Sequence, residues 1–439
     1  MADTASPAPS TFDPPPLTNA GRYIILIVAF FGWFFAGTQM AVTSIAMRAA
    51  AKDLLGAASV EGDVGNWFSF YITAFLLGAA AGGLVFGWFG DRFGRKKAMA
   101  FAILWYSVFS GLGSYADSPT QLLILRFVGC MGVGGMWPNG VALVSEAWAN
   151  LSRPAVAGII GTAANVGILT MSLGVKGYFE IDNPGPGGVD VEWRGVLWLA
   201  SVPAFLGVFA VFAVPESPRW LAARAGGSPS ETTKKPATPI SEVFGSRYIG
   251  ILIVGIILGT VPLLGGWGSS SWMNPWASQV GGDVTSADVT LWRSLTGSVS
   301  SLLGGWVGSL IGRRLAYFLF SVGALACAQY IFWFLSPENG TEFLFWVGLL
   351  GLFSGFYFGW LPLCLPEMFP TRIRSTGAGV SFNFGRILSA VTVLGAGAAL
   401  AQWLDGDYAV IGRITSFIYA IGMIAILFAP DTSKKGLED

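Results

Sequence analysis

Long apolar runs separated by short polar connections are the dominant pattern of this chain. Uncharged runs of about 20 residues are typical of membrane-spanning helices. The pattern predicts twelve such helices, six on either side of a polar stretch rich in Ser, Thr, Pro and Lys. The predicted spans are 23–44, 67–89, 98–115, 121–145, 156–178 and 195–214, then 248–267, 294–311, 316–335, 343–365, 376–400 and 410–429.

The predicted fold class is therefore an all-α integral membrane protein, in which twelve transmembrane helices form two pseudo-symmetric six-helix bundles. The expected organisation has five parts. They are a disordered cytoplasmic N-terminus (1–21), an N-terminal bundle (22–221), a cytoplasmic linker (222–246), a C-terminal bundle (247–430) and a cytoplasmic tail (431–439).

Composition supports this class and narrows the function. Of the 439 residues, 53% are hydrophobic and 11% charged, against roughly 25% charged in soluble domains. The net charge of zero excludes a strongly basic nucleic-acid binder. The chain has no histidine, and Cys130, Cys327 and Cys364 lie in apolar stretches, where we interpret them as reduced packing residues. We therefore expect no metal, no cofactor and no enzymatic activity.

Charge in the connections predicts the orientation. Connections that follow even-numbered spans carry most of the Lys and Arg, whereas acids dominate the others. The positive-inside rule then places both termini in the cytoplasm. We expect a multi-pass protein of an inner or plasma membrane, a monomer whose partners are the lipid bilayer, a small-molecule substrate and, if transport is coupled, a proton.

An internal repeat relates the two halves. Residues 87–96 align without gaps on 305–314, and both segments share Gly-Trp-x-Gly followed by a basic pair. Glu146 precedes Arg153 by seven residues, just as Glu367 precedes Arg374. Two parallel six-helix repeats around a central pathway explain this offset of about half the chain.

The repeated segments carry a family resemblance. Gly-Trp-Phe-Gly-Asp-Arg-Phe-Gly-Arg-Lys-Lys (87–97) resembles the signature loop of the major facilitator superfamily. The segment 215–221 resembles a sugar-porter motif, and 365–377 fits sugar porters and organic-acid symporters alike. The segment 383–387 is similar to helix eleven of the sialate, lactate and aromatic-acid symporter branches. The resemblance implies a secondary transporter that works by alternating access.

Two departures from those branches concern proton coupling. Related organic-acid symporters often carry acids in helix one, but 32–40 contains none, and Gly134-Gly135-Met136 stands where Gly-Gly-Glu is frequent. The missing carboxylates favour facilitated diffusion or exchange. A substrate carboxylate that itself carries a proton keeps symport open.

The resemblance also implies a latch at the cytoplasmic ends of the helices. We expect Asp91 to face the helix N-terminus near 375–377, Arg95 to pair with Glu146, and Arg153 with Glu216. Arg313, Glu367, Arg374 and Asp431 would form the matching set. The alternative is that these charges only fix the topology. The gating candidates are Gly87, Gly90, Asp91, Arg92, Gly94, Arg95, Lys96, Glu146, Arg153, Glu216, Arg313, Glu367 and Arg374.

Arg386 is the strongest substrate candidate, because an ionisable residue near mid-membrane is costly and its guanidinium fits a carboxylate. The alternative is that it only holds packing. Arg126 has a second interpretation, as a brace between helices one, four and five. The substrate-binding candidates are Arg386, Arg126, Gln39, Asn165, Asn383, Asn274, Tyr357 and Trp360.

Three further features of the second half have structural consequences. Helix seven is predicted to break near 262–266 and to line the cavity there. Trp272 and Trp276, which follow, are expected in an interfacial aromatic belt. Asp288 and Arg293 are expected at an outer helix end, where the interface solvates them.

The function predicted from these features is transport of a small organic anion, a monocarboxylate or a sugar acid. The alternative is a neutral sugar porter, either a uniporter or a proton symporter. The intact first-half latch argues against a non-transporting sensor or receptor. A channel is disfavoured because the chain has no repeated filter sequence and no ring of charges.

Overall fold

The computed structural model describes residues 17–148, 153–182, 189–218, 220–221, 242–370 and 373–430. The side chains of residues 91, 145, 153–160, 181–182, 189–190 and 374–376 are not described. Of the predicted tail at 1–21 and linker at 222–246, residues 1–16 and 222–241 lie outside the described residues, as does the predicted tail at 431–439. The last residues of the predicted disordered tail are helical, because α1 begins at Asn19.

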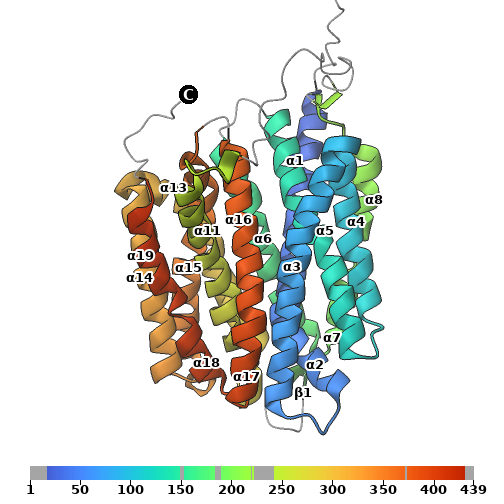
Figure 1. Cartoon of the computed structure of the whole chain (residues 1–439). Coiled ribbons are helices and arrows are strands. Elements are labelled where there is room, and N and C mark those ends of the chain that lie inside the picture. The colour runs from blue at the N-terminus through green and yellow to red at the C-terminus, as the bar shows by residue number, and fades with distance from the viewer. Residues whose placement is uncertain are drawn as a thin grey trace, which may run out of the picture.

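Helices form both halves of the molecule, which stand side by side in Figure 1. The N-terminal half contains α1 (Asn19–Ile45), α2 (Met47–Leu55), α3 (Glu61–Phe93), α4 (Arg95–Gly113), α5 (Pro119–Ala147), α6 (Arg153–Tyr178), α7 (Trp193–Leu199) and α8 (Ala204–Ala213). A short antiparallel pair, β1 (Glu180–Asp182) and β2 (Val189–Val191), connects α6 to α7.

The C-terminal half repeats this plan with more interruptions. Its elements are α11 (Ile249–Leu264), η1 (Gly265–Ser269), η2 (Ser270–Trp272), α12 (Met273–Val280), α13 (Ser286–Ile311), α14 (Arg313–Phe334), η3 (Pro337–Asn339), α15 (Thr341–Glu367), α16 (Arg374–Thr392), η4 (Val393–Gly397), α17 (Ala398–Trp403), α18 (Tyr408–Thr415), α19 (Ile418–Ala425) and η5 (Ile426–Phe428).

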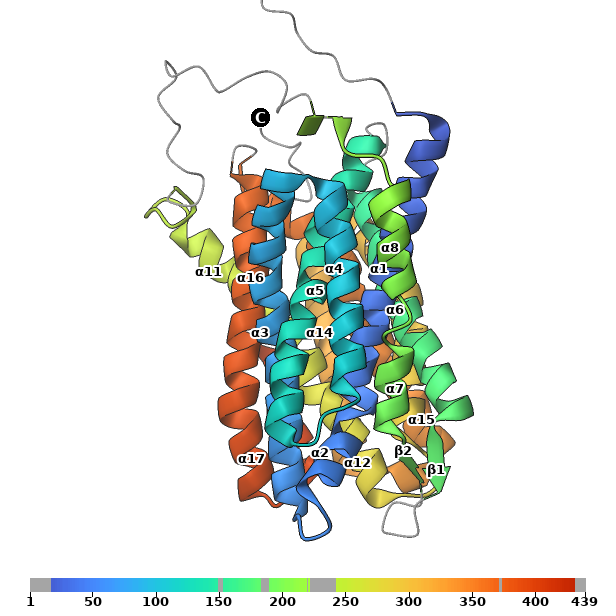
Figure 2. The same cartoon turned by 90° about the vertical axis from the view of Figure 1, so that its right-hand side faces the viewer.

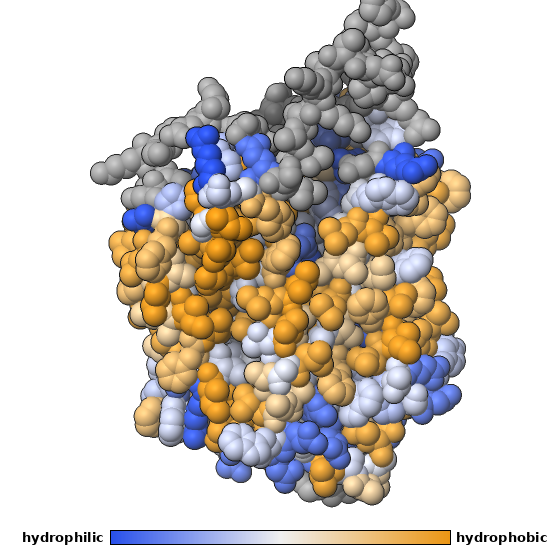
Figure 3. All heavy atoms as spheres, in the orientation of Figure 1, coloured by the Kyte–Doolittle hydropathy of each residue, from blue (hydrophilic) through white to orange (hydrophobic). Residues whose placement is uncertain are grey.

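The helices have the length and surface of membrane spans. In the described part of the chain, nine helical segments are long and apolar enough to cross a bilayer. The more polar or partly described α4, α6 and α13 stand parallel to them in the bundle and complete the twelve (Figures 1 and 2). Figure 3 shows a broad hydrophobic band with hydrophilic residues gathered toward both ends. The predicted all-α membrane fold is confirmed.

Both described chain ends lie at one end of the bundle, where α1 begins and where the chain leaves α19 (Figure 1). We call this the cytoplasmic end, following the prediction from charge, and the opposite end the outer end. The orientation of the termini itself stays a prediction.

A glycine with a positive φ marks the same junction in each half. Gly94, between α3 and α4, has φ 113° and ψ 144°, and Gly312, between α13 and α14, has φ 95° and ψ 146°. Residues with a Cβ rarely adopt this conformation. The repeat seen in the sequence is therefore also a repeat of backbone geometry.

Close helix contacts in the C-terminal half depend on glycine. A Cβ at Gly304 would lie 2.1 Å from the Phe356 carbonyl oxygen, and one at Gly359 would lie 2.2 Å from that of Ser301. A Cβ at Gly355 would lie 2.8 Å from the Cα of Gly297. Small residues let membrane helices approach until their backbones touch. These residues form a glycine seam that holds α13 against α15.

The predicted break in helix seven is present. Pro262 lies in the last turn of α11, and the following segments η1 and η2 have π and 3₁₀ geometry before α12 resumes. The expectation of an aromatic belt there is wrong. Trp272 is fully buried and Trp276 is 7% exposed. Packing decides this, because Trp272 stacks on Tyr408 and Trp276 stacks on Phe332.

Candidate transport pathway

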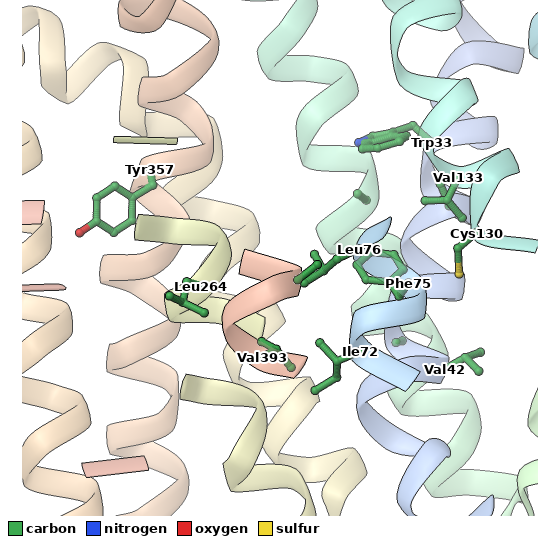
Figure 4. Close-up of a cluster of buried hydrophobic side chains, with 14 of the residues drawn as sticks. Trp33, Val42, Ile72, Phe75, Leu76, Cys130, Val133, Leu264, Tyr357 and Val393 are labelled. Carbon is green, nitrogen blue, oxygen red and sulfur yellow. The ribbon is translucent and has the colours of Figure 1, made fainter. Parts of the chain in front are cut away.

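An apolar layer closes the space between the two halves near mid-membrane. Ile72, Phe75 and Leu76 of α3 point toward Val393 and Leu264 of the other half, and all five side chains are buried (Figure 4). We call these five residues the apolar layer. Because its members come from both halves, any pathway between the halves is sealed at this depth.

Trp267 of η1 adds a ring contact beside the apolar layer. Its ring lies 4.5 Å from that of Phe75, centroid to centroid, so it joins the two halves directly. A Cβ at the neighbouring Gly266 would meet nothing within 4 Å. The broken segment therefore combines a fixed indole with open space.

Arg386 lies on the face of α16 that points into the interior. It shares this face with Ala390 and Val393, at helical spacings of four and seven residues. Val393 belongs to the apolar layer, and the Ala390 carbonyl accepts a hydrogen bond of 3.4 Å from Thr73 of α3. The opposite face carries the exposed side chains Phe384, Ile387, Leu388 and Val391. Arg386 thus faces the other half and not the lipid.

The guanidinium of Arg386 is half-buried, and its carbon lies 4.8 Å from the centroid of the Phe382 ring. Within the described residues it makes neither an ion pair nor a hydrogen bond. Since Phe382 is one turn closer to the start of the helix, the guanidinium points toward the cytoplasmic end. A permanent charge in this position is available to an anion.

Two predicted asparagines also lie between the halves. The amide of Asn165, on α6, donates a hydrogen bond of 3.1 Å to the Ser301 hydroxyl on α13. Asn383, one turn before Arg386, donates to the Gly379 carbonyl at 3.1 Å, and its oxygen would lie 3.7 Å from a Cβ at Gly83 of α3. Both amides lie at the boundary between the two halves, toward which Arg386 also points.

Arg126 and Gln39 lie elsewhere, inside the N-terminal half. Arg126 is 3% exposed and donates to the main-chain oxygen of Gln39 at 3.1 Å and to the Thr43 hydroxyl at 2.8 Å. The Gln39 side chain donates to the Ala200 carbonyl at 2.7 Å and accepts from Ser110. This network joins α1, α4 and α5 to the end of α7. It shares the first and fourth spans with the predicted brace, but it includes the third span, α4, and not the fifth, α6.

The remaining three candidates lie within the C-terminal half. Asn274 donates to the Ser286 carbonyl at 2.9 Å and to Thr290 at 2.6 Å. The Tyr357 hydroxyl lies 2.7 Å from that of Ser321, and Trp360 donates to the Arg313 carbonyl at 2.9 Å. All three candidates are at most 2% exposed. The structure therefore does not bring them together with Arg386.

The first-half gating residues meet at the start of α4. The Glu216 carboxylate accepts from the backbone N–H of Lys96 at 3.1 Å, and a Cβ at Gly94 would lie 2.1 Å from it. A carboxylate at a helix N-terminus is stabilised by the helix dipole. Glu146 accepts a hydrogen bond from the Ser217 hydroxyl. The adjacent residues Glu216 and Ser217 therefore contact α4 and α5, respectively.

The other first-half candidates have more varied surroundings. A Cβ at Gly90 would lie 2.0 Å from the Asn139 side chain, whereas one at Gly87 would meet nothing within 4 Å. The Arg92 guanidinium packs 5.6 Å from the rings of Trp88 and Phe93. The predicted contacts of Asp91 and Arg153 lie outside the described side chains, and the pairing of Arg95 with Glu146 stays a prediction.

The second half contains an ion pair at the corresponding place. Arg313 donates to both carboxylate oxygens of Glu367 at 3.2 and 3.3 Å, and the two side chains are 17% and 16% exposed. Arg314 donates to the Ala429 carbonyl at 2.7 Å. The predicted contacts of Arg374 and Asp431 lie outside the described side chains.

The outer end holds contacts that the sequence did not predict as a site. Glu61 of α3 accepts a hydrogen bond of 2.7 Å from the Tyr408 hydroxyl of α18. Lys176 of α6 pairs with Asp288 of α13 at 2.8 Å. Asp288 is 6% exposed, so the expectation that the interface solvates it is wrong, because it caps α13 and pairs across the halves. The only signal in the sequence was an excess of acids in the outer connections.

Two six-helix halves that contact each other at the outer end and near mid-membrane have the architecture of a multi-pass membrane carrier. The Major Facilitator Superfamily profile matches residues 24–393, and the chain belongs to that family.

Relatives and solved structures agree with this assignment. A putative niacin/nicotinamide transporter of Bacillus subtilis is 28% identical over 92% of this chain and 93% of its own length. A cis,cis-muconate transport protein of Acinetobacter baylyi is 26% identical over 84% of this chain and 85% of its own. The inward open xylose transporter XylE of E. coli has a TM-score of 0.69 at 18% identity, covering 95% of this chain and 98% of that one, which shows the shared fold.

Proposed function

We propose that this secondary transporter carries a small organic anion, a monocarboxylate or a sugar acid, by alternating access. The observation that carries the proposal is the guanidinium of Arg386, which faces the other half and has no acidic partner among the described residues. An uncompensated charge at this depth is costly. A substrate carboxylate compensates it each time the site is filled.

The surroundings of Arg386 support an anion with a polar or planar body. Asn383 and Asn165 supply amides on the same boundary, and Trp267 and Phe75 supply ring faces at the apolar layer. The names of two relatives include niacin and muconate, which are carboxylic acids, and the first name also includes nicotinamide, a neutral amide. These names support the class of substrate and leave its identity to experiment.

We also propose facilitated diffusion or exchange as the mode of transport. The buried Arg126 is held by Gln39 and Thr43, which are neutral, and α1 contains no acidic residue. This arrangement removes the intramembrane carboxylate through which related symporters would bind a proton.

Counterflow in proteoliposomes tests the substrate class, because it needs no driving force. Labelled nicotinate, lactate, a sugar acid and a neutral hexose are compared for the unmodified protein and Arg386→Gln. We expect the unmodified protein to exchange a carboxylate. The exchange rate should fall at least about tenfold in the variant, because roughly one charge-assisted hydrogen bond to the substrate is lost. Exchange of the hexose alone would replace this proposal with the neutral sugar porter, and full carboxylate exchange by the variant would remove Arg386 from the substrate site.

A further inference from the structure

The outer contact between Glu61 and Tyr408 is partly buried and is shared by the two halves. Glu61 is the first residue of α3 and Tyr408 the first residue of α18, and their side-chain oxygens are 2.7 Å apart. Tyr408 is fully buried. An outward opening of the halves must break this hydrogen bond, because its two ends belong to different bundles.

Arg48 fixes the carboxylate on the N-terminal side. Its Nε donates to one Glu61 oxygen at 3.0 Å and its Nη2 to the other at 2.8 Å, and the residue is 5% exposed. Such two-point pairing holds a carboxylate in one orientation. Glu61 is thereby presented to Tyr408 as a charged acceptor, which makes the shared hydrogen bond stronger than one between neutral groups.

Glycines on both sides permit the close approach. A Cβ at Gly65 would lie 3.0 Å from the Tyr408 oxygen, and one at Gly406 would lie 2.7 Å from the Glu61 Cγ. Gly406 also has φ 74°, in the region that favours glycine. The contact therefore depends on the backbone at two positions of the chain, Gly65 and Gly406.

Tyr408 also connects this contact to the broken helix. Its ring stacks on Trp272 at 5.6 Å with an interplanar angle of 20°, and Trp272 in turn lies 5.8 Å from Phe68 of α3. Trp272 ends η2, directly after the π segment that carries Trp267. A displacement of η1 by a substrate is thus transmitted to Tyr408 through consecutive residues and one ring stack.

The second outer contact is of a different strength. Lys176, which pairs with Asp288, is 44% exposed, and ion pairs with an exposed partner contribute about 0–1 kcal/mol. The buried group around Glu61 is the stronger of the two. We therefore expect the contacts of Glu61, and not the Lys176–Asp288 pair, to control the opening of the outer end.

We propose that Glu61 and Tyr408, with Arg48 as the positioning residue, form the outer gate of this transporter. The hydrogen bond holds the outer end closed, and its rupture is the step that commits the protein to face outward. This inference requires alternating access, which the family provides, and does not depend on Arg386 or on the substrate.

Cysteine labelling of membrane vesicles of known orientation tests the gate without any substrate. The first reporter is Ser69→Cys, because Ser69 is fully buried and would lie 3.7 Å from a Cβ at Gly397 of the other half, outside the apolar layer. The second is Gly83→Cys, on the cytoplasmic side of that layer. An impermeant thiol reagent is added from either side, and labelling is measured at each position by mass spectrometry.

Tyr408→Phe removes only the hydroxyl and keeps the ring on Trp272. We expect labelling at position 69 from the outer side to rise about tenfold, the equivalent of one hydrogen bond to a charged group. Labelling at position 83 from the cytoplasmic side should fall in parallel, which a general loosening would not cause. Tyr115→Phe, on an exposed ring in the N-terminal half, is the matched control and should change neither.

Glu61→Gln is the second variant, in case Tyr408→Phe does not assemble. It keeps an acceptor for Tyr408 but loses the charge, so a smaller rise at position 69 is expected. If both variants label like the parent at both reporters, Glu61 and Tyr408 do not gate the outer end. Such a result would leave the organic-anion proposal intact, because that proposal is measured separately by counterflow.

Discussion

The Arg126 guanidinium donates to the main-chain oxygen of Gln39 at 3.1 Å, and the two residues anchor a hydrogen-bonded network inside the N-terminal half. Every partner of this cation among the described residues is neutral. An arginine in helix four, which in the sequence is a candidate for the substrate, therefore has the surroundings of a structural residue.

Replacing Arg126 by methionine should lower stability more than substrate affinity. The variant leaves the Gln39 carbonyl and the Thr43 hydroxyl without a donor, which costs about 1–3 kcal/mol for each unsatisfied buried group. A thermal-unfolding assay in detergent should show a clear decrease in the midpoint, while the KM for counterflow stays within about twofold. Arg194→Gln is the control for the loss of an arginine, at a partly exposed residue that pairs with Asp53 outside this network. A variant with normal stability and a strongly raised KM would return Arg126 to the substrate site.

Alanine at Gly94 or Gly312 should destabilise the junctions between helices. Both residues have a positive φ, and forcing a side chain into such a conformation costs about 1–3 kcal/mol. At Gly94 the added Cβ also meets the Glu216 carboxylate, which adds to the loss. The midpoint of thermal unfolding reports both.

Gly87→Ala is the matched control for these two variants. Gly87 lies inside α3, seven residues before Gly94, and its added Cβ meets nothing within 4 Å. Alanine is favoured over glycine in a helix by about 0.5–1 kcal/mol. Stability should therefore stay equal or rise. Equal losses in all three variants would contradict the role assigned to the positive φ.

The Arg313–Glu367 pair should show energetic coupling. Arg313→Ala, Glu367→Ala and the double variant form a double-mutant cycle, for which contacting residues typically give about 0.5–3 kcal/mol. The cycle is measured on thermal stability and, separately, on the counterflow rate. Coupling in stability alone would make the pair a structural clamp, and coupling in the rate would support the predicted latch.

Glu180, the first residue of β1, should make the outer end sensitive to pH. Burial raises the pKa of its carboxyl above the usual 4.5, opposed by Thr285 and Lys176 and assisted by Asp288. A group with a raised pKa stabilises the fold below its ordinary pKa, and this contribution is lost as pH rises through the raised value. Between pH 4 and 7 the unmodified protein should therefore lose stability relative to Glu180→Gln. Parallel stability curves for the two proteins would contradict this.

A pH gradient alone should not drive uptake. Reconstituted protein is loaded with a carboxylate at equal concentrations on both sides, and an inward proton gradient is imposed. With Gln39 opposite Arg126, we expect no accumulation above the level of proton leak. Accumulation that a protonophore abolishes would establish symport and would direct the search to acids outside α1, Glu61 among them.

The sequence predicted the helices well and the contacts between halves poorly. The span 121–145 compares with Pro119–Ala147 in the structure, and the break predicted at 262–266 is followed by π geometry from Gly265. Length and hydropathy act locally, so they can be identified from one segment at a time. The repeat at Gly94 and Gly312 was also visible in the sequence, because each copy is a short motif that can be identified within one segment.

Contacts such as Glu61 with Tyr408 could not be predicted in the same way, because they join residues 347 positions apart. An acid in an outer connection has the same sequence pattern whether it is solvated or buried against the other half. The same reason explains the error at Trp272. Tryptophan favours both an interface and a tight ring stack, and only the position of Tyr408 decides between them.

The glycine seam between α13 and α15 has a mechanical consequence. Backbones that touch at Gly304, Gly355 and Gly359 cannot slide past each other without a collision. At the cytoplasmic end the Arg313–Glu367 pair ties α15 to the start of α14, the helix that follows α13. The C-terminal half should therefore turn as a stiff lever arm. A movement of about an ångström at the substrate would then be amplified along the length of the C-terminal half. The transport cycle would not require flexibility within that half.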